Sequence, residues 1–224
     1  AQRGNLGWSY EDVLPHFKNI ETYIPVKQND PDYRLKRQFR GSNGEMIVTD
    51  LAWRDPLCEA FINAALAFGI PFNSDYNAET QEGVSYVQRT ATNMFRMSAA
   101  RAFLKPALKR KNLRLIKNAL VTKLIFNEDR VIGVNFQRNK RSDTINFIGA
   151  RKEVIVSGGA INSAQLLQLS GVGPSKILLS RGIPIKRDIT GVGKNLRDHL
   201  ATRLTARAKN VQTINEMSRG IKLV

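Results

Sequence analysis

Residues 158–173 read GGAINSAQLLQLSGVG, and they predict the fold class better than any other part of the chain. The stretch follows a short apolar run, Val154–Val156, and begins an apolar stripe at helical spacing, which predicts a strand, a glycine turn and a helix. Glycines at such a turn let the backbone approach a ligand closely. The helix start behind them presents unpaired N–H groups and the positive end of the helix dipole. This arrangement suits the phosphates of a nucleotide cofactor.

Three helices are predicted before this stretch. Ser9 and Asp12 form the pattern of a capping box, so a helix is expected through Ile20, with a bend at Pro15 left open. A second helix has Asp55 as its cap, Pro56 at its first position and Gly69 after its end. Its expected buried face consists of Leu57, Phe61, Ala64, Ala65 and Phe68. A third helix is predicted over 98–104, disturbed at Pro106.

The second half of the chain is rich in apolar and β-branched runs divided by polar turns. The helix that opens at Gly159 follows one of these runs. Together this order predicts a mixed α/β fold. The predicted strands are 113–116, 120–126, 131–136, 144–148, 153–157 and 183–188, with turns at 127–130 and 138–142, a helix at 175–180 and an exposed loop at 27–44.

Composition excludes several classes of protein. Cys58 is the only cysteine among 224 residues, which rules out an internal disulfide and a cysteine-based zinc site and favours a reducing compartment. Cys58 lies in an apolar helical pattern and is expected to pack as a small hydrophobe. The net charge of +16 is mostly spread along the chain, without a nucleic-acid-binding motif, so a solvated basic face is expected.

The chain termini and apolar runs give no sign of membrane insertion. No apolar run reaches the roughly 20 residues that span a bilayer. No signal peptide is expected. The chain does not begin with methionine, so its native start is expected to be missing.

Four stretches together resemble one family. Residues 159–173 resemble the second signature of the glucose–methanol–choline (GMC) flavoprotein oxidoreductases, with one departure, Ala164, where the family favours Pro or Ser. Three more stretches resemble GMC motifs and follow the family's order: GWSYEDVLPHF at 7–17, RMSAARAFL at 96–104 (continued by Asn112–Leu113) and ITGVGKNLRDH at 189–199. Met94 and Phe95 stand where relatives carry Gly and a basic residue, which leaves the substrate open.

The resemblance implies a fold and a function. The expected fold is the central part of a GMC-type FAD-binding α/β domain with the start of a substrate domain. Residues 1–112 are then a helical and loop region between the two domains, 113–199 part of the FAD-binding domain, and 200–224 the start of the substrate domain. The implied function is that of an internal fragment of an FAD-dependent alcohol dehydrogenase, choline-dehydrogenase-like, which passes hydride from a primary alcohol to flavin and releases an aldehyde.

The resemblance also assigns cofactor-binding residues. The main chain of Val121 matches the strand position that contacts the adenine of FAD, with an ordinary buried strand residue as the alternative. Ser157, Gly158, Gly159 and Ala160 match the turn beside the adenosine half, where ordinary turn geometry is the alternative. Asn195 matches the loop between the two domains, in which a structural role is the alternative.

No catalytic or metal-binding residue is assigned. In GMC proteins a histidine near the C-terminus removes the alcohol proton, and no segment here matches it, so neither His16 nor His199 is expected to be that base. The fingerprint G-x-G-x-x-G does not occur in the chain. Residues 191–195 lack an earlier glycine and a Ser or Thr after the lysine, which rejects a phosphate-binding P-loop. The 224 residues alone are therefore expected neither to hold FAD tightly nor to turn over.

Two alternatives to an enzyme fragment remain open. A basic, non-enzymatic nucleic-acid-binding module would bind DNA or RNA with strong salt dependence, and a decayed GMC relative would share the ancestry without the activity. The expected partner is a small alcohol rather than a nucleic acid, and the expected location is the cytoplasm, with attachment to the inner membrane face left open. The sequence leaves the identity of the alcohol, the electron acceptor and the choice between dehydrogenase and oxidase undetermined.

Overall fold

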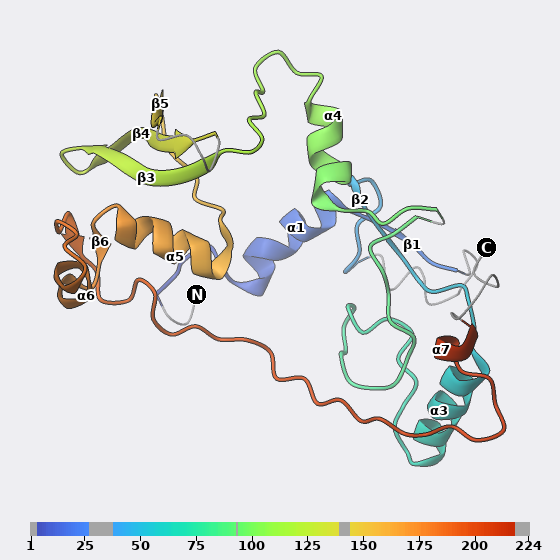
Figure 1. Ribbon diagram of the computed structural model, residues 1–224. Coiled ribbons are helices and arrows are strands. Elements are labelled where there is room, and N and C mark those ends of the chain that lie inside the picture. The colour runs from blue at the N-terminus through green and yellow to red at the C-terminus, as the bar shows by residue number, and fades with distance from the viewer. Residues whose placement is uncertain (1–3, 27–37, 93, 139–143, 218–224) are drawn as a thin grey trace. The chain divides into compact units, whose positions relative to one another are not determined.

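A computed structural model describes residues 4–26, 38–92, 94–138 and 144–217 (Figure 1). The chain divides into two compact units. One comprises residues 1–114 with 206–224, and the other comprises residues 115–205.

The first unit begins with helix α1, Tyr10–Ile20. The predicted capping box is confirmed, because Ser9 Oγ accepts the Asp12 N–H at 3.3 Å and Asp12 Oδ2 accepts the Ser9 N–H at 2.9 Å. The hydrogen bond from the Ser9 backbone lowers the pKa of Asp12, so this carboxylate stays ionised at the positive end of the helix. Pro15 lies inside the helix, which continues to Ile20.

A pair of short strands that the sequence did not predict follows α1. Strand β1, Glu21–Ile24, begins directly after the helix and pairs in parallel with β2, Met46–Thr49. Tyr23 is buried in this pair. Each strand has only four residues, which is too short a pattern for periodicity to identify.

Helix α3, Pro56–Ala67, begins where the sequence predicts. The side chain of Asp55 accepts the N–H groups of Leu57 and Cys58 at 2.9 and 3.3 Å. Gly69, at φ +94°, follows its end, as expected of a helix stop. The start, the cap and the end of this helix are therefore confirmed.

The predicted buried face of α3 is right only for Ala65. Ile62 and Ala65 are its buried residues, whereas Phe61 is 71% and Phe68 87% exposed. The helix is apolar over most of its circumference, so its pattern could not determine which face turns inward.

The predicted third helix is present, with a different geometry. Residues Ala100–Leu104 form a π-helical turn, η1, which continues into α4, Lys105–Ala107. Ala102 is buried. Pro106 lies in α4, directly after the π-helical turn, and does not end the helix, because the Leu108 N–H still donates to the C=O of Leu104 at 2.9 Å. In the same unit, the short helix α7 spans Ile214–Met217.

The second unit contains a three-stranded antiparallel sheet in the order β3-β4-β5. The strands are β3 (Leu120–Asn127), β4 (Arg130–Gln137) and β5 (Asn146–Gly149). Asn127 pairs with Arg130 across the predicted turn, which confirms the first hairpin. Residues 139–142 of the second predicted turn lie outside the described residues. The predicted strand at 113–116 is wrong, because those residues form no strand.

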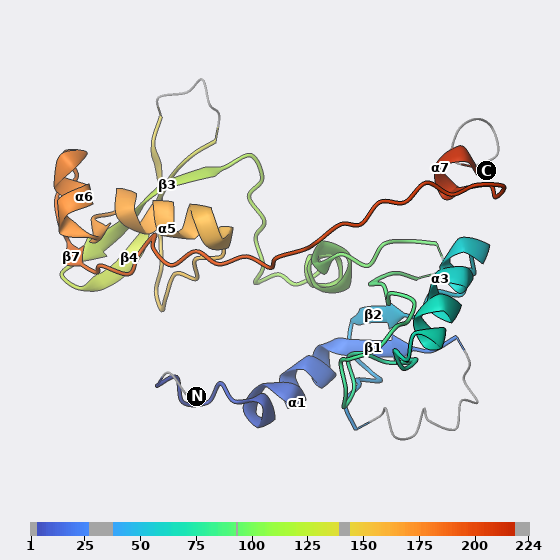
Figure 2. The same ribbon diagram turned by 90° about the horizontal axis from the view of Figure 1, so that it is seen from below.

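Helix α5, Gly159–Leu169, begins at the predicted glycine turn and packs against β3. The two elements lie side by side in both views (Figures 1 and 2). The predicted buried strand at 153–157 before α5 is wrong, because these residues form no strand and Ile155 is 78% exposed. A buried parallel strand needs strands beside it, and the described residues supply none there.

A small parallel pair ends the unit. Strand β6, Val172–Gly173, pairs with β7, Arg187–Asp188. Helix α6, Ser175–Ser180, connects them and confirms the predicted helix. Its Leu178 is fully buried. The predicted strand at 183–188 is thus reduced to its last two residues.

Candidate cofactor site

A cavity of about 320 Å³ lies between strand β3 and helix α5 in the second unit. Three of the residues predicted to bind a cofactor, Val121, Ser157 and Gly158, line it. They come from β3 and from the turn before α5. The other lining residues are Leu120, Leu124, Val134, Val154, Ile155, Val156, Asn162, Gln165, Leu166 and Leu169. Most of this wall is apolar, as in pockets that hold the ring of a ligand.

The register of the sheet determines where the backbone of Val121 points. The Leu124 N–H turns away from β4, because it donates to Ser170 Oγ at 2.8 Å. Between Leu124 and Val121 the strand carries one extra residue, Thr122, as a bulge. Backbone direction alternates along a strand, and a bulge shifts this alternation by one residue. The N–H and C=O of Val121 therefore also point away from β4.

No described strand lies on that side of β3, which is the edge of its sheet. The backbone of Val121 thus offers one donor and one acceptor beside an apolar cavity. A purine ring needs this combination, because its edge carries hydrogen-bonding nitrogens and its faces are apolar.

The turn before α5 presents a second set of donors. Gly158 is the cap residue of the helix, and no side chain caps the first turn. Gly159 has φ +86°, and a Cβ placed there would meet no described atom within 4 Å. The first N–H groups of this 11-residue helix thus have no side-chain cap, which is the condition under which a helix start can bind an anion.

The remaining predicted residues lie apart from the cavity wall. Gly159 and Ala160 form the first turn of α5 but do not line the cavity. Asn195 does not line it either and has a left-handed backbone, with φ 57°. Its loop is tied to α5, because Gln168 Nε2 donates to the C=O of Val192 at 3.1 Å.

Four lining residues of α5 were missed by the sequence analysis. Asn162, Gln165, Leu166 and Leu169 follow the spacing i, i+3, i+4 and i+7, which places them on one helix face. This spacing, read together with the glycine turn, is the signal that could have found them.

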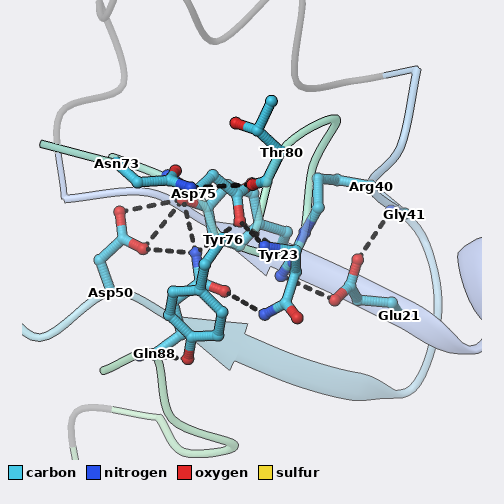
Figure 3. Close-up of polar contacts among 11 residues, drawn as sticks. Glu21, Tyr23, Arg40, Gly41, Asp50, Asn73, Asp75, Tyr76, Thr80 and Gln88 are labelled. Carbon is cyan, nitrogen blue, oxygen red and sulfur yellow. Dashed lines mark hydrogen bonds and ion pairs between the residues drawn. The ribbon is translucent and has the colours of Figure 1, made fainter. Parts of the chain in front are cut away.

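The first unit holds a separate buried polar cluster, shown in Figure 3. Arg40 is only 6% exposed and pairs with Glu21 (Nη2–Oε1 2.8 Å) and Asp75 (Nη1–Oδ1 3.5 Å). Its guanidinium lies 4.3 Å from the centre of the Tyr23 ring. The charge of Arg40 is therefore compensated within the cluster, and a ligand is not needed to neutralise it.

Tyr23 and Gln88 extend this cluster. The Tyr23 hydroxyl donates to Asp50 at 2.9 Å, and Gln88 Nε2 donates to Asp75 at 3.0 Å and to Asp50 at 3.2 Å. Burial, and then the hydrogen bond to the Asp50 carboxylate, raises the pKa of Tyr23. The phenol thus stays protonated at neutral pH. The network joins strand β1 to the loops that carry Asp75 and Gln88, which is a structural role.

The two histidines take no part in such a cluster. Both are exposed. The backbone N–H of His199 donates to Asp198 Oδ1 at 2.8 Å. Among the described residues, no group of three His, Cys, Asp or Glu side chains could hold a metal ion. The described helices include none that is both long and apolar enough to cross a membrane.

The family model of the GMC oxidoreductases matches residues 1–201, which is most of the chain. The chain belongs to the GMC oxidoreductase family. The expected fold class is confirmed with it, since solved GMC-type oxidoreductases share the arrangement of helices and strands.

Two curated relatives and two solved structures illustrate the similarity. Oxygen-dependent choline dehydrogenases of Brucella anthropi and Staphylococcus saprophyticus are 40% and 43% identical over 200 and 197 residues, covering 89% and 88% of the chain. An FAD-dependent oxidoreductase from Chaetomium thermophilum is 31% identical with a TM-score of 0.80 over 87% of the chain. Pyridoxine 4-oxidase from Mesorbium loti is 26% identical with a TM-score of 0.72 over 84%.

The chain spans only about a third of the length of these proteins, 34% and 33% of the two dehydrogenases and 34% and 35% of the two solved chains. Membership in the family therefore applies to the matched part.

Proposed function

We propose that this GMC chain holds the adenosine half of FAD in the cavity between β3 and α5. The observation that carries the proposal is the backbone of Val121, which points its N–H and C=O away from β4 beside a cavity that Ser157 and Gly158 also line. The adenine would bond the Val121 main chain, and the phosphates would lie toward the uncapped start of α5. Asn195 would contribute from the loop that Gln168 ties to the helix.

In the whole protein, we propose that the activity is oxidation of a primary, choline-like alcohol to an aldehyde. FAD supplies the redox chemistry of such a reaction by accepting hydride. This chain supplies binding and orientation: β3 and the first turn of α5 anchor one end of the cofactor, which fixes where its other end can reach. No proton transfer is assigned to a residue of this chain.

The names of the relatives support the substrate class. Two of them are choline dehydrogenases described as oxygen-dependent, at 40% identity or more. We accordingly place choline first among the alcohols to be tested and oxygen first among the electron acceptors.

The test uses the protein encoded by the complete reading frame that contains this chain. We expect it to be purified with bound FAD, seen in its visible absorbance spectrum, and to oxidise choline faster than an unrelated primary alcohol. A protein that binds no FAD, or that instead binds DNA with strong salt dependence, would contradict the proposal. The 224-residue chain alone is expected to hold FAD weakly and to show no turnover.

A further inference from the structure

A single buried hydroxyl joins helix α5 to strand β3. Ser170 Oγ accepts the N–H of Leu124 at 2.8 Å and donates its own proton to the C=O of Leu166 at 2.6 Å. Ser170 is only 4% exposed. Leu124 belongs to β3 and Leu166 to α5, and both line the candidate cofactor cavity. One oxygen atom therefore links the two walls of the cavity.

The outer edge of β3 makes this link necessary. Leu124 is buried, and its N–H points away from β4, where no described strand could accept it. A buried N–H without an acceptor destabilises the fold about as much as a lost hydrogen bond. Because the Ser170 proton is committed to Leu166, a lone pair of Oγ stays directed at Leu124.

The backbone around Ser170 is held on both sides. The Ser170 N–H donates to the C=O groups of Leu166 and Leu167 at 3.1 and 3.0 Å. The next residue, Gly171, has φ +88°, and its C=O accepts the N–H of Lys186 at 2.7 Å. Ser170 is thus fixed on the α5 side, and its hydrogen bond to Leu124 ties β3 to that helix.

We propose that Ser170 is a positioning residue of the cofactor site. It holds β3 at the distance from α5 at which the backbone of Val121 can bond the adenine of FAD. Ser170 does not line the cavity itself, so it acts through Leu124. It also occupies the Leu124 N–H, so that this donor is not open to a ligand. The inference rests on the proposed function.

The first test is Ser170→Ala in the protein encoded by the complete reading frame. We expect the dissociation constant of FAD to rise about tenfold, as it would if one molecule in ten kept β3 in the binding position. The kcat at saturating FAD should stay unchanged, because the adenosine end takes no part in hydride transfer. Ser170→Thr keeps the hydroxyl and should restore tight binding.

Ser180→Ala is the matched control. Ser180 also ends a helix and donates to a carbonyl of that helix, Ile177, at 2.8 Å, but it is exposed and its hydroxyl contacts no strand. FAD binding should not change in this variant. A role confined to stability would lower the thermal unfolding midpoint of Ser170→Ala and leave its FAD affinity at the level of the control, which would overturn the inference.

Hydrogen exchange separates this inference from the proposed function. Without FAD, the peptide that contains Leu124 should exchange faster in Ser170→Ala than in the unchanged protein, and slow exchange in both would overturn the link itself. If the unchanged protein binds no FAD, the proposed function and the cofactor role of Ser170 both fail. Normal FAD affinity in Ser170→Ala, with binding by the unchanged protein intact, would overturn the inference alone.

Discussion

Replacing Val121 by proline removes one backbone donor from the candidate adenine site and leaves the carbonyl in place. Proline is tolerated on an edge strand where its missing N–H would point away from the neighbouring strand, and the register of β3 places Val121 in that situation. The substitution should therefore spare the sheet. A lost hydrogen bond of this kind is worth about 1 to 1.5 kcal/mol, which corresponds to roughly a tenfold rise in the dissociation constant of FAD.

The assay is titration of the FAD-free full-length protein with FAD, with Val121→Ala as the matched control. The alanine variant keeps the N–H and should bind FAD within about twofold of the unchanged protein, because backbone rather than side-chain atoms make the contact. ADP carries the same adenosine and should lose affinity in parallel with FAD in the proline variant. Equal weakening by alanine and proline would refute the backbone contact. So would a proline variant that binds FAD normally.

Three further predictions concern the first unit. Asp55→Ala removes the acceptor for the first amides of α3 and should lower the free energy of unfolding by about 1 kcal/mol. Urea unfolding measures this loss, with Asp55→Asn, which keeps a side-chain oxygen, as the control. An unchanged urea midpoint in Asp55→Ala would show that the cap is dispensable. Because the fold raises the pKa of Tyr23, this phenol contributes fully to stability below the pKa of tyrosine in the unfolded chain, and the contribution is lost as pH rises above about 10. Between about pH 8 and about pH 11 the unchanged protein should therefore lose more free energy of unfolding than Tyr23→Phe does. Equal losses in the two proteins would contradict the raised pKa. Burial, and then the charge of Asp55, raises the pKa of Cys58. Its thiol should therefore react with a disulfide reagent at about pH 8 more slowly than free cysteine does. A reaction rate equal to that of the denatured protein would contradict the raised pKa.

The sequence predicted the elements whose signals are local. The capping box at Ser9 and Asp12, the cap at Asp55 and the hairpin between Asn127 and Arg130 each depend on a few neighbouring residues. The helix after the Gly158 turn depends on an apolar period over about three turns. Each of these signals acts through residues close together in the sequence, and the structure contains every element that they predict.

The sequence failed where distant residues determine the outcome. The run around Ile155 has the composition of a buried strand, yet pairing requires neighbours that the described residues do not supply. The inward face of α3 depends on what packs against the helix, which its own pattern does not encode. The Arg40 cluster joins residues up to 67 positions apart, from Glu21 to Gln88, and no local spacing in the sequence predicts it.

Part of the candidate site could be predicted from the sequence, and part could not. The resemblance to GMC proteins identified Val121, Ser157 and Gly158, which line one cavity. The link through Ser170 was not foreseen, because it joins Leu124 to a residue 46 positions away. Contact with the cofactor stays a prediction for the three lining residues, and for Asn195, Gly159 and Ala160 as well.

The most direct test of the cofactor site is the structure of the full-length protein with FAD bound. We predict that the adenine lies in the cavity between β3 and α5, with a ring nitrogen or amino group within about 3.2 Å of the N or O atom of Val121. An adenine bound elsewhere, with this cavity filled by protein side chains, would contradict the account.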